Sequence, residues 1–132
     1  MGIDADQESD YLDPAGLDLH LVCHLTTTGR VTGRSHTIEI WFAHHRGAVY
    51  LLSGAGRRSD WVRNIVRSPR VTVGVGGRRW LGRARIVDDP AEAGFARNLV
   101  HDRYRPRYAG DLTGWRDSAL PIAIDLEGGA TS

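Results

Sequence analysis

Apolar and polar residues alternate along the first half of the chain with the period of two that is typical of β-strands. Every second residue from 19 to 25 is apolar, which predicts a strand over 19–27. The stretch 26–36 contains two Gly-Arg pairs and little to bury, so it is predicted to be a loop that reverses the chain. β-Branched and aromatic residues predict two more strands, over 37–44 and 48–53, joined by a hairpin turn.

The second half of the chain mixes helical and strand periods. The helix starts are marked by Ser59, which can cap a helix, and by Asp89 followed by Pro90, an N-cap with proline at the first helical position. The predicted elements are a helix over 59–67, strands over 70–75 and 78–88, a helix over 90–104, a loop over 107–118 and a strand over 119–126.

The order of these elements predicts the fold class. Connections of hairpin length favour antiparallel pairing over crossover units, and no G-x-G-x-x-G sequence follows the first strand, as a dinucleotide-binding fold would require. We therefore expect a mainly β protein, a barrel of about six antiparallel strands with two to three peripheral helices, in a single domain over 13–128. Residues 1–12 are expected to form a disordered acidic arm and 129–132 a frayed tail.

The composition of the chain indicates the class of protein and its cellular compartment. The chain has 132 residues, of which 41% are hydrophobic and 25% charged, values typical of one globular domain. Its one cysteine, Cys23, cannot form an intrachain disulfide, and its place on the apolar face of a strand favours a buried, inert thiol. The sequence starts without a basic and then apolar leader and has no apolar run near the ~20 residues of a membrane span. These features predict a cytoplasmic protein without a membrane span.

Charge is distributed unevenly. Residues 21–110 contain 16 Arg and six acidic residues, whereas residues 1–20 contain six acidic residues and no Arg. All 17 basic residues are Arg, which indicates a coding bias that accounts for most of the total. The clustering itself favours an anionic ligand, because guanidinium groups bind phosphate and carboxylate through paired donors.

Three kinds of chemistry find little support. No G-x-S-x-G sequence is present to indicate a nucleophilic serine. The six His residues show neither H-E-x-x-H nor C-x-x-C spacing, so we expect no metal site. The four Trp residues fall on different elements and the pI is about 8.0, which disfavours nucleic-acid binding.

The most informative residues lie in two glycine-arginine stretches, 26–36 and 52–58, and at the start of the helix that follows. Backbone N–H groups and guanidinium groups could converge there on a phosphate. Trp41, on the strand between them, could form a flat wall for a ring. Taken singly, each residue could equally be a solvated loop charge, a core aromatic or a turn glycine.

Four motifs resemble the deazaflavin-dependent nitroreductase family, part of the flavin and deazaflavin oxidoreductases that also include pyridoxamine-phosphate-oxidase-like proteins. The motifs are L-T-T-T-G-R-x-T-G-R at 25–34, I-E-I-W-F at 38–42, L-S-G-A-G-R-R-S-D-W-V-R-N at 52–64 and S-P-R-V-T-V at 68–73. The resemblance covers residues 19–126 and implies a split β-barrel, a homodimer in the flavin-binding branches, and coenzyme F420, a deazaflavin with a phosphate and an oligoglutamate tail.

The resemblance also implies which residues contact the cofactor. In the family the first loop grips the phosphate, the next strand lines the ring, and the turn after the third strand lies beside ring and tail. Val31 stands where members often have a second basic residue, so Arg34 or His36 can take that part of the grip. The stretch from Ser53 to Trp61 is also shorter than in some nitro-reducing members. The cofactor-binding residues so implied are Arg30, Arg34, His36, Glu39, Trp41, Ser53, Gly54, Arg57, Arg58, Trp61 and Asn64.

The implied activity is hydride transfer from reduced deazaflavin to an electron-poor small molecule such as a quinone, an enone or a nitro compound. The cofactor carries the hydride, so the protein has to position the reactants and exclude water. By analogy with the family, Tyr104 and Tyr108 face the acceptor. The alternatives are an FMN-binding oxidoreductase on the same barrel, a non-catalytic deazaflavin carrier, and a nucleic-acid-binding module.

Overall fold

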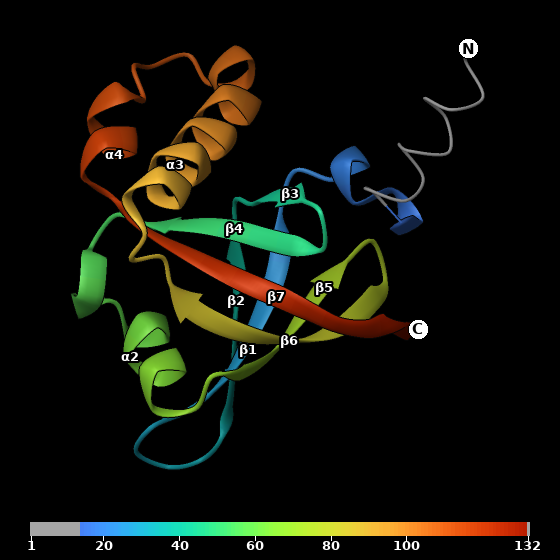
Figure 1. Ribbon diagram of the computed structural model, residues 1–132. Helices are drawn as coiled ribbons and strands as arrows, with labels where there is room; N and C mark the ends of the chain where they lie inside the picture. The colour runs from blue at the N-terminus through green and yellow to red at the C-terminus, as the bar shows by residue number, and fades with distance from the viewer. Residues whose placement is uncertain (1–13, 132) are drawn as a thin grey trace.

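The computed structural model describes residues 14–131, which form one curled sheet of seven antiparallel strands with helices at its two ends (Figure 1). The elements are η1 (Pro14–Leu19), β1 (Cys23–Thr28), β2 (Ser35–Ile40), β3 (Ala43–His45), β4 (Ala48–Ser53), η2 (Gly56–Arg58), α2 (Asp60–Arg67), β5 (Arg70–Val75), β6 (Arg78–Ile86), α3 (Pro90–Tyr104), η3 (Arg105–Arg107), α4 (Thr113–Ser118) and β7 (Leu120–Thr131). The strands are ordered β2-β1-β5-β6-β7-β4-β3 across the sheet.

The sheet closes into a split barrel through a short corner in the chain. β2 and β3 are the two edges of the sheet, yet only Trp41 and Phe42 separate them in sequence. The three peptide units between Ile40 and Ala43 reach at most about 11 Å. The edges must therefore lie near each other, although the strand pairings of the described residues do not join them. The expected mainly β split barrel is confirmed.

Two hydrophobic clusters lie on opposite sides of β4, whose six residues are all buried. Val49 and Leu51 point into the barrel, where they pack with residues such as Phe42 and Ile122. Tyr50 and Leu52 point outward and are covered by α3. This explains why the strand is apolar on both faces, unlike one that faces water.

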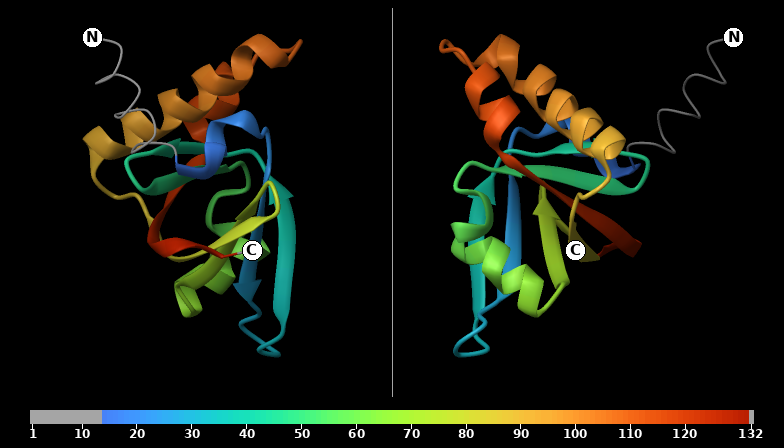
Figure 2. Two further views of the ribbon diagram at one scale, coloured as in Figure 1. Left: turned by 90° about the vertical axis from the view of Figure 1, so that its right-hand side faces the viewer. Right: turned by 60° about the vertical axis from the view of Figure 1, so that its left-hand side comes forward.

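The helices occupy opposite ends of the barrel (Figure 2). α3 and α4 lie together at one end, whereas α2 lies at the other, beside the loop that joins β1 to β2. The start of α3 agrees with the prediction, since the Asp89 side chain accepts a hydrogen bond from the Glu92 N–H at 2.9 Å and Pro90 follows it. Ser59 stands at the N-cap of α2 as expected, but its side chain makes no capping hydrogen bond there.

Several predicted boundaries are wrong, each for a physical reason. The first strand begins at Cys23 rather than at 19, because the preceding residues form the 3-10 helix η1 and leave Leu19 and Leu21 exposed. The strand predicted over 37–44 is two strands, since the chain turns at the barrel corner. The region 107–118 is not all loop, because α4 begins at Thr113.

The C-terminal strand is longer than the sequence predicts. β7 runs to Thr131, past the expected end at 126, and includes positions 129–131 that the sequence assigns to a frayed tail. The expected acidic arm over 1–12 lies outside the described residues. None of the helices in residues 14–131 has the length and apolar character needed to span a bilayer. The cytoplasmic location expected from the sequence stays a prediction.

Candidate functional site

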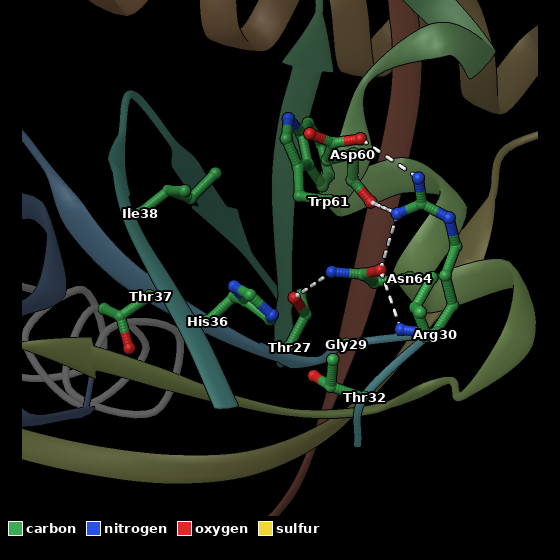
Figure 3. A pocket seen from close by; sticks show the side chains of 11 residues that line it. Thr27, Gly29, Arg30, Thr32, His36, Thr37, Ile38, Asp60, Trp61 and Asn64 are labelled. Carbon is green, nitrogen blue, oxygen red and sulfur yellow. Dashed lines mark hydrogen bonds and ion pairs between the residues drawn. The ribbon is translucent and has the colours of Figure 1, made fainter. Parts of the chain in front are cut away.

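A cavity of about 420 Å³ lies between the β1–β2 loop and the first turn of α2 (Figure 3). We call it the loop cavity; it is lined by Thr27, Gly29, Arg30, Val31, Thr32, His36, Thr37, Ile38, Asp60, Trp61 and Asn64. Its volume falls within the range of small-molecule sites. Four residues predicted to bind a cofactor meet here, namely Arg30, His36, Trp61 and Asn64.

The β1–β2 loop is held in a compact shape by its own backbone. The N–H of Gly29 donates to the carbonyl of Arg34 at 2.7 Å, and the N–H of Gly33 donates to the carbonyl of Gly29 at 2.9 Å. Gly33 has a φ of +77°, which glycine adopts without strain. A Cβ on Gly29 would come within 2.6 Å of Nε2 of His36, so a glycine is needed there for the imidazole to line the cavity.

Arg30 fastens this loop to α2. Its Nη1 donates to Oδ1 of Asn64 at 2.9 Å, and its Nη2 donates to Oδ1 of Asp60 at 3.1 Å. The backbone N–H of Arg30 also donates to Oδ1 of Asn64, at 3.2 Å. The predicted phosphate-gripping residue is therefore already held by two partners from the neighbouring helix.

Asn64 is the buried centre of this arrangement, with 4% of its surface exposed. Besides accepting from Arg30, it donates from Nδ2 to Oγ1 of Thr27 at 3.1 Å, which ties α2 to β1. Both ends of the amide thus have partners, as a buried polar side chain requires. Asn64 supports the wall of the loop cavity.

The first turn of α2, with Asp60 and Trp61, also forms part of this wall. Its cap residue Ser59 directs Oγ to Oγ of Ser53, 2.7 Å away, rather than to the helix N–H groups. Backbone N–H groups at the start of a helix attract anions when no side chain caps them. Ser53, predicted to touch a cofactor, is buried and donates to the carbonyl of Gly56 at 2.9 Å, so it shapes the turn before α2.

An aromatic cluster forms a second place of interest, where β2 ends. Trp41 stacks on Tyr104 with ring centroids 4.3 Å apart and an interplanar angle of 2°, and it meets Tyr108 and Trp115 edge to face, each with centroids 5.8 Å away. Gly54 adjoins this cluster, because a Cβ there would lie 3.7 Å from the Trp115 ring. Tyr108 is the exposed member, with 48% of its surface accessible.

Tyr104, predicted to face the acceptor, is a buried member of this cluster. It is 2% exposed, its hydroxyl donates to the carbonyl of Leu21 at 2.5 Å, and it accepts from the N–H of Phe42 at 2.9 Å. Burial raises the pKa of Tyr104 above its ordinary value. The neighbouring Arg103 bonds to the carbonyls of Phe42 and His20 and lies over the Phe42 ring. Tyr104 and Arg103 therefore position the corner that carries Trp41.

The other predicted site residues lie around these two places. Arg34 and the η2 residues Arg57 and Arg58 are exposed. Arg57 lines a different cavity, of about 370 Å³, between α2 and β6. Glu39 lies on β2 with its Oε2 3.4 Å from Nε2 of His24. These four residues do not line the loop cavity.

Seven of the eleven lining residues were not predicted as site residues, and two of these seven, Thr27 and Asp60, form hydrogen bonds to Asn64 and Arg30. Thr27 lies on a strand, and the alternation of that strand indicates which face Thr27 is on but not that this face lines a cavity. Asp60 is an acidic residue in a first helical turn, where acidic residues are common for reasons of stability. Thr27 could have been found from its place in the T-T-T-G-R motif. The partnership of Asp60 with Arg30, 30 residues away, has no signal in the sequence.

The lining of the loop cavity suits binding rather than covalent catalysis. It combines a guanidinium, an imidazole and the start of a helix, which bind anions, with the ring of Trp61, which packs on the barrel core. The only thiol, on Cys23, is fully buried, and burial raises its pKa to about 12, so it is not a nucleophile near neutral pH. The thiol of Cys23 therefore supplies no covalent chemistry to the loop cavity.

Comparison with known families gives one match over nearly the whole chain. The model of a family described as F420H(2)-dependent quinone reductase matches residues 13–127.

Solved structures share the fold. A conserved hypothetical protein from Mycobacterium tuberculosis superposes with a TM-score of 0.67 at 20% identity, covering 93% of this chain and 80% of that one. An F420-H2-dependent reductase gives 0.64 at 19%, covering 81% and 94%. A chain described as a domain-swapped dimer gives 0.64 at 19%, covering 96% and 98%. Identities this low show the architecture alone.

Proposed function

The chain belongs to the F420H(2)-dependent quinone reductase family and is an F420-dependent reductase, and from this premise we propose that it passes a hydride to an electron-poor small molecule such as a quinone, an enone or a nitro compound. The family expected from the sequence motifs is thereby confirmed. The identity of the acceptor within that chemical class, and the residues that bind it, are proposals.

We propose that the loop cavity holds the phosphate part of coenzyme F420. The observation that carries this assignment is the convergence of Arg30, His36, Trp61 and Asn64, which come from a loop, a strand and a helix, on one cavity. A guanidinium, an imidazole and an uncapped helix start are suited to a phosphate. The residues present fit the anionic part of the cofactor.

The ring of the cofactor is assigned to the region where β2 leads toward Trp41. From His36 to Trp41 the chain advances five residues, about 16 Å in an extended strand. An elongated cofactor could lie along this strand, with its charged part at the loop and its flat ring near the aromatic cluster. Exposed Arg34, Arg57 and Arg58 are proposed to face the acidic tail.

Reduced F420, when bound, supplies a hydride, so the protein residues need only bind, orient and exclude water. Stacked Trp41 and Tyr104 form a rigid flat surface at the barrel corner. Tyr108 is half exposed and edge to face with Trp41, which makes it our candidate for contact with the acceptor. Tyr104 is assigned a positioning role.

The proposal is tested by fluorescence titration of the cofactor-free protein with oxidised F420 and, in parallel, with FMN and a short single-stranded oligonucleotide. We expect micromolar or tighter binding of F420 alone. Arg30→Ala and Arg57→Ala should each weaken it by more than about tenfold, because each removes a charged donor. Exposed Arg78, at the start of β6, provides the matched control, Arg78→Ala.

Each other result has a definite meaning. Preference for FMN would move the protein to the flavin branch of the barrel, and binding of the oligonucleotide alone would contradict the reductase proposal. Tight F420 binding that neither Arg30→Ala nor Arg57→Ala weakens would refute the residue assignment while leaving the activity in place.

We propose that the protein forms a homodimer. Two observations support this: a similar solved chain is described as a domain-swapped dimer, and β2 is a six-residue edge strand whose residues are mostly exposed. Edge strands offer unpaired backbone groups to a second chain. Sedimentation equilibrium at micromolar concentration should give twice the chain mass of 14.6 kDa, and a single-chain mass would contradict the dimer.

A further inference from the structure

We propose that the carboxylate of Asp60 occupies the position on Arg30 that an anionic ligand takes, so that Asp60 must leave Arg30 for the cofactor phosphate to bind. This inference rests on the proposed function of the loop cavity and names the residue that controls its affinity. In that role Asp60 is an internal competitor of the ligand rather than a member of its binding set.

The two partners of Arg30 differ in how firmly they hold it. Asn64 is buried and accepts from both the backbone N–H and Nη1 of Arg30. Asp60 accepts from Nη2 at 3.1 Å, but 86% of its side chain is exposed, compared with 29% for Arg30. Nη1 is therefore fixed by the fold, whereas Nη2 is held by a side chain that lies mostly in water.

A phosphate can replace the carboxylate of Asp60 on Arg30 because both offer anionic oxygens to the same N–H donor. An ion pair with an exposed partner is weak, since water and salt screen it. Figure 3 shows Asp60 and Arg30 at the same side of the loop cavity, with Nη2 directed to the carboxylate. A phosphate that entered the cavity would meet a guanidinium whose charge is already matched, together with a carboxylate that repels it.

The alternative role of Asp60 is structural, because an acidic residue in the first turn of a helix is stabilised by the helix dipole. The two roles predict opposite results for the isosteric variant Asp60→Asn. If Asp60 only supports α2, the variant should leave F420 affinity unchanged or lower it. If Asp60 competes for Arg30, the variant should raise the affinity.

The experiment is a fluorescence titration of the intact protein with oxidised F420, using wild type, Asp60→Asn and Asp117→Asn. Asp117 is a matched control. It also lies on a helix and pairs with an arginine, its Oδ1 being 2.9 Å from Nε of Arg116, but it does not line the loop cavity. We expect Asp60→Asn to bind F420 about three- to fivefold more tightly, because one exposed ion pair no longer has to break. Asp117→Asn should stay within about twofold of wild type.

A second arm tests whether the effect passes through Arg30. In an Arg30→Ala background, or an Arg30→Lys background if the alanine variant does not fold by circular dichroism, Asp60→Asn should tighten binding much less than in wild type. Such coupling is what a double-mutant cycle detects between contacting residues. An equal gain in both backgrounds would overturn the inference, because the charge would then act without Arg30.

The outcomes separate this inference from the function on which it rests. Wild type that binds F420 while Asp60→Asn binds equally or more weakly overturns the competitor role and leaves the reductase intact. Wild type and variants that all fail to bind F420 overturn the proposed site, and the inference falls with it.

Discussion

At the scale of single residues, the loop cavity depends on Asn64, a buried amide on which three parts of the chain converge. Its side chain links α2 to Thr27 of β1 and to both the backbone and the guanidinium of Arg30. Leaving such partners unpaired in a buried place costs about 1–3 kcal/mol. The side chain of Asn64 therefore contributes both to the wall of the loop cavity and to the stability of the fold.

Asn64→Ala is predicted to lower the free energy of unfolding by about 2–3 kcal/mol, because two hydrogen-bonded partners lose their acceptor or donor. Urea unfolding followed by tryptophan fluorescence measures the change. The control is Asn98→Ala on α3, where the side chain is exposed and a change within about 0.5 kcal/mol is expected. Equal effects of the two substitutions would contradict the central role of Asn64.

At the scale of elements, α3 is joined to the sheet by a charged network. Arg85 of β6 bonds to both carboxylate oxygens of Glu92 at 2.8 Å and to Asp125 of β7 at 2.8 Å. Tyr50 of β4 donates to Glu92 at 2.8 Å, and burial together with this bond raises the pKa of Tyr50 to about 12. The bonds from Arg85 lower the pKa of Glu92 to about 2 from an ordinary 4.5. α3 is thereby fixed over β4, β6 and β7.

The network predicts a pH-dependent contribution to stability. Since the folded state lowers the pKa of Glu92, its carboxylate stabilises the fold above pH 4.5 and this contribution is lost as the pH falls toward 2. Glu92→Gln should therefore cost about 2 kcal/mol at pH 7 and little near pH 2.

Urea unfolding at pH 7, 4 and 2.5 measures the difference between wild type and Glu92→Gln. Glu127→Gln is the control, because Glu127 pairs with Arg70 and Arg83 where the side chains are largely exposed, at 3.3 and 3.9 Å. It should cost less than about 1 kcal/mol at pH 7. A Glu92→Gln deficit that stays constant from pH 7 to pH 2.5 would argue against the ion pair as its source.

At the scale of the whole molecule, the barrel holds the loop cavity beside the start of β2 and the aromatic cluster beyond its end at Ile40. A ligand that contacts both should stabilise the folded protein as a unit. A ligand that binds only the folded state adds about 2.7 kcal/mol at a concentration 100 times its Kd.

F420 at that excess is predicted to raise the melting temperature by at least about 5 °C, given the usual conversion for domains of this size. Differential scanning fluorimetry or circular dichroism measures the shift. Trp41→Ala, in the aromatic cluster, and His36→Ala, in the loop cavity, should each reduce the shift in melting temperature. If His36→Ala abolishes the shift and Trp41→Ala does not change it, the ligand contacts only the loop cavity.

Much of the barrel could be predicted from local pattern. β-Branched and aromatic residues predict the strand over 48–53, and alternation predicts the strand over 70–75. The turn glycines Gly76 and Gly77 have positive φ between paired strands, and Asp89-Pro90 opens a helix. The Gly-Arg motifs located the loop that lines the cavity. These features depend on neighbours in sequence, where backbone sterics and hydrophobic period act directly.

Other features of the protein depend on residues far apart in the sequence, and only the tertiary structure shows them. The corner at Trp41 and Phe42 interrupts a strand that its own residues favour, because the sheet must turn there to bring its two edges together. Tyr104 is buried and its hydroxyl accepts from the N–H of Phe42, 62 residues away, a contact that no local pattern indicates. Arg30 looks like a free loop cation in the sequence, yet Asp60 and Asn64 already hold it. Local sequence determines which elements form, whereas the charge and exposure of a side chain depend on which residues the closed barrel places against it.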